Sequence, residues 1–169
     1  PFFAYYPMAL SHAVSNDLDP HPPLGPQGRY MTFAEMMAEM DKRVGQIVDA
    51  VDKLGLKNKT LILFTTDNGT TPMNYIRHEG RELVLDAPVT STINGNQLLG
   101  QKGKFNDWGT RVPTIARWPG RIAEGTTTDI LGDGTDLLPT FAELGGQQEI
   151  DHPLDGASCA KLFTEGTSP

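Results

Sequence analysis

Two oxygen-bearing side chains, Asp67 and Asn68, stand together directly after the apolar run of residues 61–66. In open α/β sheets, ligands bind beyond the carboxyl ends of the strands, which is where this pair lies if the run is a strand. Carboxylate and amide oxygens are hard ligands that suit Ca²⁺ or Mg²⁺. Asp-Asn-Gly is also a common tight-turn sequence, and a turn is its more frequent role. A metal site and a plain turn therefore both stay open on these residues alone.

Two lysines, Lys102 and Lys104, lie in a turn bounded by Gly100 and interrupted by Gly103. Ammonium groups on a glycine-rich turn could bind an oxyanion such as sulfate or phosphate. The turn is not a Walker A loop, because Gln101 occupies the position where that motif needs lysine. A solvated basic turn is the alternative interpretation.

His12 and Cys159 are the other candidates for chemistry. The imidazole of His12 follows the N-terminal apolar stretch and could act as a general acid or bind an oxyanion, although a lone histidine is more often a surface or structural residue. Cys159 has no recognisable nucleophile turn and no histidine beside it, so we expect a partly buried structural thiol.

Composition excludes several classes of function. The chain has 169 residues, a formal net charge of −7 and a single cysteine. An acidic balance gives no electrostatic footprint for nucleic acid. One thiol excludes an internal disulfide and a multi-cysteine zinc site. The longest aliphatic and aromatic run, residues 61–64, is far shorter than a membrane span.

Hydrophobic spacing predicts the elements that position these residues. Apolar residues recur every three or four positions over residues 31–54, which predicts a helix ending before Gly55. Strands are expected at 60–66 and 114–118, and a short helix at 136–144. Residues 70–100 have no sustained period and are expected to form a long excursion with a hairpin around Asn94-Gly95. Helices alternating with apolar strands predict an α/β fold with a buried sheet.

The chain opens on the apolar, aromatic stretch PFFAYYPM at residues 1–8, which predicts a buried strand. A protein rarely begins inside its core. We therefore expect this chain to be part of a longer polypeptide, with any targeting information upstream.

The order of these segments resembles the later part of the type I sulfatases, members of the alkaline-phosphatase-like superfamily. The resemblance rests on PFFAYYPMALSHA, on the helix with MDKRVG, on the strand ending in TDNG, on GQKGKFNDWGTRVP with WPG, and on TDLLPTFAELGG and PLDGAS. It covers nearly the whole chain, with residues 70–98 the least matched.

The resemblance implies roles for four residues. Asp67 and Asn68 are expected to ligate a divalent cation, Ca²⁺ or Mg²⁺. Lys102 is expected to bind the sulfate oxygens, and His12 to contact the sulfate or the leaving-group oxygen. The implied substrate is a sulfated small molecule or glycan, and the family resemblance also suggests a periplasmic or secreted location.

The family's formylglycine motif, C/S-x-P-S-R, is not in this sequence, because Lys161 and Phe163 stand where Cys159 would need proline and arginine. The resemblance thus implies that residues 1–169 are a C-terminal portion of a sulfatase catalytic domain, an incomplete α/β mixed sheet flanked by helices. The N-terminal half, with the formylglycine, is its expected partner, and this chain alone is expected to be inactive. Two alternatives stay open: a phosphate or phosphonate ester hydrolase of the same superfamily, and a non-catalytic anion-binding or assembly module.

Overall fold

The computed structural model describes residues 2–12, 33–72, 74–79, 82–93, 95–147 and 150–166. These residues group into two compact units. The first unit consists of Pro1–Phe3, Val51–Asp67 and Thr114–Pro169, and the second of Ala4–Ala50 and Asn68–Pro113. The candidate site residues fall mostly in the second unit.

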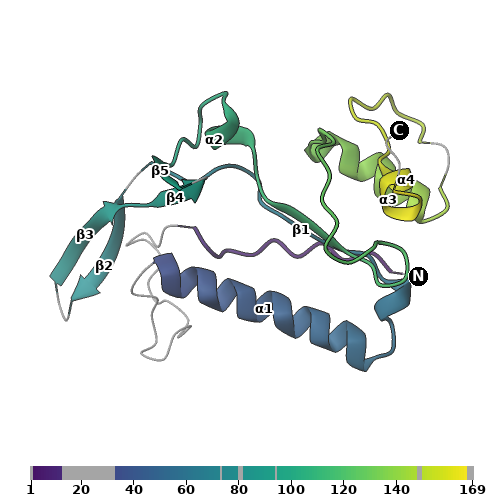
Figure 1. Cartoon of the computed structure of the whole chain (residues 1–169), viewed down its shortest axis with the longest axis horizontal. Helices are drawn as coiled ribbons and strands as arrows, with labels where there is room; N and C mark the ends of the chain where they lie inside the picture. Colours follow the sequence, from purple (N-terminus) through teal and green to yellow (C-terminus); the bar gives the residue numbers. More distant parts are fainter. Residues whose placement is uncertain are drawn as a thin grey trace. The chain divides into compact units, whose positions relative to one another are not determined.

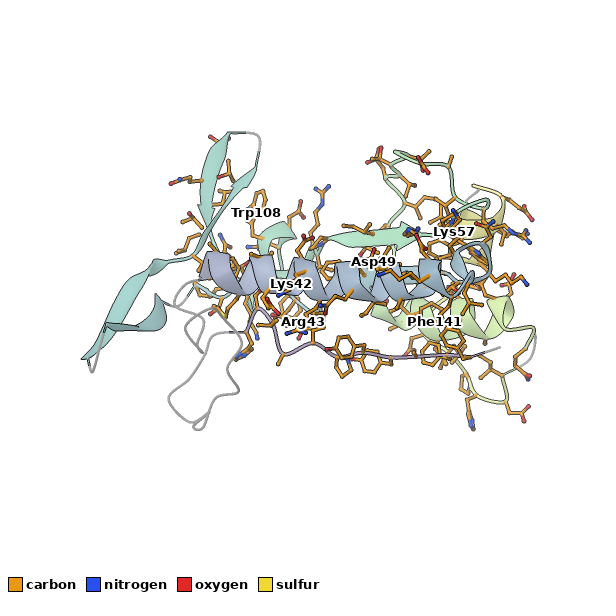
Figure 2. The ribbon with its side chains drawn as sticks, turned by 90° about the horizontal axis from the view of Figure 1, so that it is seen from below. Lys42, Arg43, Asp49, Lys57, Trp108 and Phe141 are labelled. Atoms are coloured by element: carbon orange, nitrogen blue, oxygen red, sulfur yellow. The ribbon has the colours of Figure 1, made fainter. Side chains whose placement is uncertain are left out.

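The long helix α1 spans Phe33–Lys53, which confirms the helix predicted over residues 31–54 (Figure 1). Its apolar stripe buries Met36, whose side chain is 2% exposed, whereas Met37 is 38% exposed and not part of a core. Within the helix, Arg43 Nε lies 2.7 Å from Oε1 of Glu39, whose side chain is 11% exposed; Arg43 is labelled in Figure 2. Gly55 follows with φ +70°, a left-handed conformation that ends the helix.

The first unit holds a two-stranded antiparallel sheet. Strands β1 (Ile62–Thr65) and β6 (Thr114–Arg117) confirm the strands expected at 60–66 and 114–118, and they pair in the register Ile62↔Arg117 and Thr65↔Thr114. β1 is half-buried rather than fully buried, because β6 is its one partner among the described strands.

Ionic and polar contacts tie this sheet to the chain that leads into it. Arg117 binds Asp52, near the end of α1, with Nη2 and Oδ2 2.8 Å apart. The Trp118 indole N–H donates to the carbonyl oxygen of Asn58, at 3.2 Å, in the 3₁₀ turn η1 (Lys57–Lys59). The contacts of Arg117 and Trp118 thus hold the C-terminal end of β6, whereas Thr114, at its other end, lies opposite Thr65.

A small helical cluster completes the first unit. It contains the 3₁₀ turn η2 (Gly134–Asp136), helix α3 (Leu137–Leu144) and helix α4 (Ala160–Thr164). α3 confirms the helix expected at 136–144. The Phe141 ring, labelled in Figure 2, lies 5.4 Å from the ring of Phe3.

Thr140 is the polar centre of this cluster. It is 1% exposed, and its hydroxyl donates to the Asp136 carbonyl at 2.6 Å and accepts the Cys159 N–H at 2.8 Å. Burial, with the charge of Asp136 adding to it, raises the pKa of the Cys159 thiol. Cys159 is partly buried, as predicted.

Replacing Thr140 by valine is expected to destabilise this cluster by about 1–3 kcal/mol, because the isosteric side chain leaves the Cys159 N–H without its partner. Thr140→Ser is the matched control, since it keeps the hydroxyl and removes one methyl group, a loss of about 0.8 kcal/mol. Urea denaturation of both variants measures the difference. If the serine variant had a lower free energy of unfolding than the valine variant, the packing of the Thr140 side chain, and not its hydroxyl, would be what stabilises the cluster.

The second unit carries most of α1, two hairpins and a short helix. Strand β2 (Asn74–Glu79) pairs with β3 (Glu82–Pro88), and β4 (Thr90–Ile93) pairs with β5 (Asn96–Leu99), both antiparallel (Figure 1). The second hairpin confirms the prediction at Asn94-Gly95, with Gly95 at φ +79°. The β2–β3 hairpin lies where only irregular chain was predicted. Helix α2 (Asp107–Thr110) follows and was also missed.

The N-terminal aromatic stretch differs from its prediction. Residues 2–9 form no strand, and Phe2, Phe3, Tyr5 and Tyr6 are between 62% and 81% exposed. The prediction of a buried strand was wrong for this chain, because none of the described strands forms a ladder with it.

The fold class predicted from the sequence is confirmed at the level of α/β. Helices and small antiparallel sheets alternate along the chain. None of the described helices is long and apolar enough to cross a membrane.

Candidate functional site

Asp67 and Asn68 directly follow β1, as the sequence predicted. Asp67 is exposed, and Asn68 is half-buried. The next residue, Gly69, donates its N–H to the carbonyl oxygen of Gly109, at 2.9 Å. Gly69 does not have a positive φ, and a Cβ on it would collide with the carbonyl oxygen of Trp108, so close backbone approach is what requires glycine here. Trp108 is labelled in Figure 2.

The turn that carries Lys102 docks on the same segment. The Lys102 N–H donates to the carbonyl oxygen of Thr70, at 3.0 Å. Gly100 packs so tightly against Thr70 and Thr71 that a Cβ would lie 2.5 Å from the Thr71 carbonyl oxygen. The structure thus joins the backbone that follows Asn68 to the backbone of Lys102.

Within the turn, the backbone N–H groups of the two lysines have different hydrogen-bond partners. Both side chains are exposed, on either side of Gly103, which has φ +88°. The Lys104 N–H donates to Gln101 inside its own turn, at 3.0 Å, whereas Lys102 is bonded to the Thr70 segment. Lys102 is therefore the lysine whose backbone is bonded to the segment that follows Asn68.

Asn106 closes the turn and starts helix α2. Its side-chain oxygen accepts the Gly109 N–H at 3.1 Å, and its side-chain amide donates to Gln101 Oε1 at 2.6 Å. Gly109 is buried against the turn, and a Cβ on it would lie 2.7 Å from the Gln101 carbonyl oxygen and collide with that of Lys104. Gly69, Gly100 and Gly109 are together called the glycine contacts below. They allow three backbone segments to pack closely: the segment after Asn68, the Lys102 turn and helix α2.

His12 lies in the same unit, at a bend that follows the N-terminal stretch. Its N–H donates to the Ala9 carbonyl oxygen at 3.1 Å, and its imidazole is exposed. The backbone hydrogen bonds of Gly69 and Lys102 join the segment after Asn68 to the Lys102 turn. The backbone hydrogen bond of His12, in contrast, stays within its own turn.

Asp67 and Asn68 have the oxygen ligands that a hard cation prefers, but two side chains are too few to fill its coordination shell. Asp67 and Asn68 offer a carboxylate and an amide oxygen, whereas Ca²⁺ takes six to eight oxygens. Within the part of the chain that the structure describes, no three His, Cys, Asp or Glu side chains gather at metal-binding distance. Further ligands are needed to complete such a site.

The residues that sequence reasoning missed are those that organise the turn: Gln101, Asn106 and the glycine contacts. Asn106 carries a readable signal, because asparagine is a favoured N-cap residue. Gln101 carries none, although its partner Asn106 is only five residues away. Gly69 and Gly100 carry none either, since they are required by segments about 30 to 40 residues away in sequence.

Comparison with known proteins places this arrangement in a family. The family model described as Sulfatase matches residues 1–147. Arylsulfatase A of Bos taurus is 36% identical over 170 aligned positions, which cover 100% of this chain and 30% of that protein. Arylsulfatase A of Homo sapiens is 33% identical with the same coverage, and N-acetylgalactosamine-6-sulfatase of Rattus norvegicus is 30% identical over 98% of this chain and 29% of that protein.

The chain thus spans about 30% of the length of the curated relatives it matches. The span of the family match includes Asp67, Asn68, the Lys102 turn and the glycine contacts. With a family model matched over most of its length, and relatives above 30% identity along all of it, this chain belongs to the sulfatase family.

Proposed function

We propose that these residues are part of a sulfuric ester hydrolase and supply the anion-binding side of its site together with part of its metal site. The observation that carries the proposal is the connection between the two segments: Lys102 N–H to Thr70, and Gly69 N–H to Gly109. These bonds hold the backbone of Lys102, the proposed anion-binding residue, beside the segment that follows Asn68, a proposed metal ligand.

Asp67 and Asn68 would hold Ca²⁺ or Mg²⁺, which supplies charge neutralisation at the ester oxygens when bound. The exposed Asp67 carboxylate and the hard oxygen donors support this assignment. The remaining ligands are proposed to come from polypeptide outside these residues, as is a formylglycine that supplies the nucleophilic hydroxyl.

The residues of this chain have separate tasks in the proposed reaction. Hydrolysis of a sulfate monoester forms a bond from a nucleophile to sulfur and breaks the bond from sulfur to the alcohol oxygen. The Lys102 ammonium group neutralises the sulfate oxygens, and this attraction lowers the barrier most where charge grows in the transition state. His12 donates a hydrogen bond or a proton to the departing oxygen, which leaves as the alcohol.

The rest of the catalytic domain is the proposed partner of this chain, with residues 1–169 as its C-terminal portion. The exposed N-terminal aromatic stretch supports this arrangement, because large apolar side chains at more than 60% exposure leave apolar area for another part of the protein to cover. Because these residues contain no C/S-x-P-S-R motif for the nucleophile, we expect the isolated chain to be inactive.

The test compares turnover of a matched aryl sulfate and aryl phosphate by the native polypeptide that carries these residues. We expect the sulfate ester to be hydrolysed with the higher kcat/KM, and residues 1–169 alone to hydrolyse neither. A preference for phosphate would favour a phosphoester hydrolase of the same superfamily. Hydrolysis of neither by the native polypeptide would favour a non-catalytic anion-binding module.

A further inference from the structure

The turn from Gln101 to Asn106 is closed by a side-chain bond that the proposed chemistry does not use. Asn106 Nδ2 donates to Gln101 Oε1 at 2.6 Å. The ring that this bond closes contains Lys102, Gly103, Lys104 and Phe105. We call this pair the clasp.

The clasp is connected at both ends to backbone that cannot move freely. On the Asn106 side, the same side chain accepts the Gly109 N–H at 3.1 Å, and the Asn106 carbonyl accepts the Thr110 hydroxyl at 2.9 Å. On the Gln101 side, the carbonyl oxygen accepts the Lys104 N–H at 3.0 Å and lies against Gly109. The next residue, Lys102, donates to Thr70.

A lysine side chain is a point charge on a flexible stem, so its affinity for an anion depends on how well its backbone is held. Residues that fix such a backbone before the anion arrives reduce the entropy lost on binding. The clasp can act in this way, because it closes the turn that carries Lys102 while both of its own side chains are uncharged.

We propose that Gln101 and Asn106 are positioning residues that set the affinity of Lys102 for a sulfate group. The inference rests on the proposed function for the identity of the anion. It extends that function by assigning part of the sulfate affinity to a hydrogen bond that does not involve the lysine side chain.

Two neutral substitutions separate the clasp from the rest of the turn. Gln101→Met keeps the length of the side chain and removes the acceptor. Asn106→Ser keeps an oxygen for the Gly109 N–H, because serine is a good N-cap residue, but is too short to reach Gln101. Gln97→Met, at an exposed position of β5, is the matched control.

The measurement is the Kd of inorganic sulfate for the native polypeptide, by isothermal titration calorimetry. Each single variant is expected to weaken binding about threefold to tenfold, the usual effect of one lost hydrogen bond. The double variant is expected to bind as weakly as the weaker single variant, because both changes remove the same bond. The control is expected to bind like the wild type, and all the variants to keep its thermal unfolding midpoint.

Additive losses, unchanged affinity, or losses that follow a falling unfolding midpoint would each overturn the inference, as would a wild-type polypeptide that binds no sulfate. The readout is binding rather than turnover, so the two proposals fail separately. A polypeptide that binds sulfate with the expected coupling but hydrolyses no sulfate ester would refute the proposed function and leave the clasp in place.

Discussion

Gly109→Ala is expected to destabilise the native polypeptide by about 3 kcal/mol, at the upper end of the usual cost of inserting a methyl group into a packed site. The added carbon would meet backbone rather than side chains: 2.7 Å from the Gln101 carbonyl oxygen, 3.0 Å from the Lys104 carbonyl carbon, and closer to the Lys104 oxygen. Backbone atoms in a closed turn cannot rotate away as a flexible side chain can. Urea denaturation measures the loss.

Gly45→Ala is the matched control for Gly109→Ala. Gly45 lies in α1, where a Cβ would meet nothing within 4 Å. Alanine there should stabilise the protein by about 1 kcal/mol, the helix-propensity difference between the two residues. Opposite signs for the same substitution would identify close approach as the cause. A Gly109→Ala variant as stable as the wild type would show that the turn can shift, and the glycine contacts would then not hold Lys102.

Local elements could be predicted from this sequence because their signals are local. The apolar spacing of α1 and the left-handed Gly55 are readable within one segment, as is the apolar run of β1. The antiparallel pairing of β1 with β6 is not readable in this way, since it depends on contacts such as Thr65 with Thr114, 49 residues apart. The aromatic N-terminal stretch was predicted wrongly for the same reason: composition indicates a preference for burial but not which strand provides it.

The candidate site shows the same limit. Residue chemistry identified Asp67, Asn68 and the two lysines, but it could not choose between Lys102 and Lys104 without the family resemblance. The structure adds a physical difference, because the Lys102 N–H bonds to the segment that follows Asn68, whereas the Lys104 N–H bonds within its own turn. The glycines that permit this contact have no sequence signature, since Gly69 and Gly100 are required by neighbours far away in sequence rather than by their own φ angles.

Lys102→Ala is expected to lower kcat/KM for an aryl sulfate about 10²- to 10³-fold in the native polypeptide, the usual effect of removing one group that stabilises transition-state charge. Alanine keeps the N–H that donates to Thr70, so the turn and the unfolding midpoint should be preserved. Steady-state kinetics at several substrate concentrations, with a thermal melt of each variant, measures both quantities. A loss confined to KM would instead indicate that the lysine binds substrate and transition state equally.

Lys104→Ala is the matched control, because it removes the same charge from the same exposed turn. An exposed, solvated charge acts on a nearby anion with at most about 1 kcal/mol, so the loss in kcat/KM should stay below about fivefold. Salt then separates the two roles. The Lys104 effect should fade as ionic strength rises, since it acts through solvent, whereas the Lys102 effect should persist, since it requires direct contact with sulfate oxygens. Equal losses for the two variants, both removed by salt, would mean that the turn attracts anions as a whole and that Lys102 has no place of its own in the reaction.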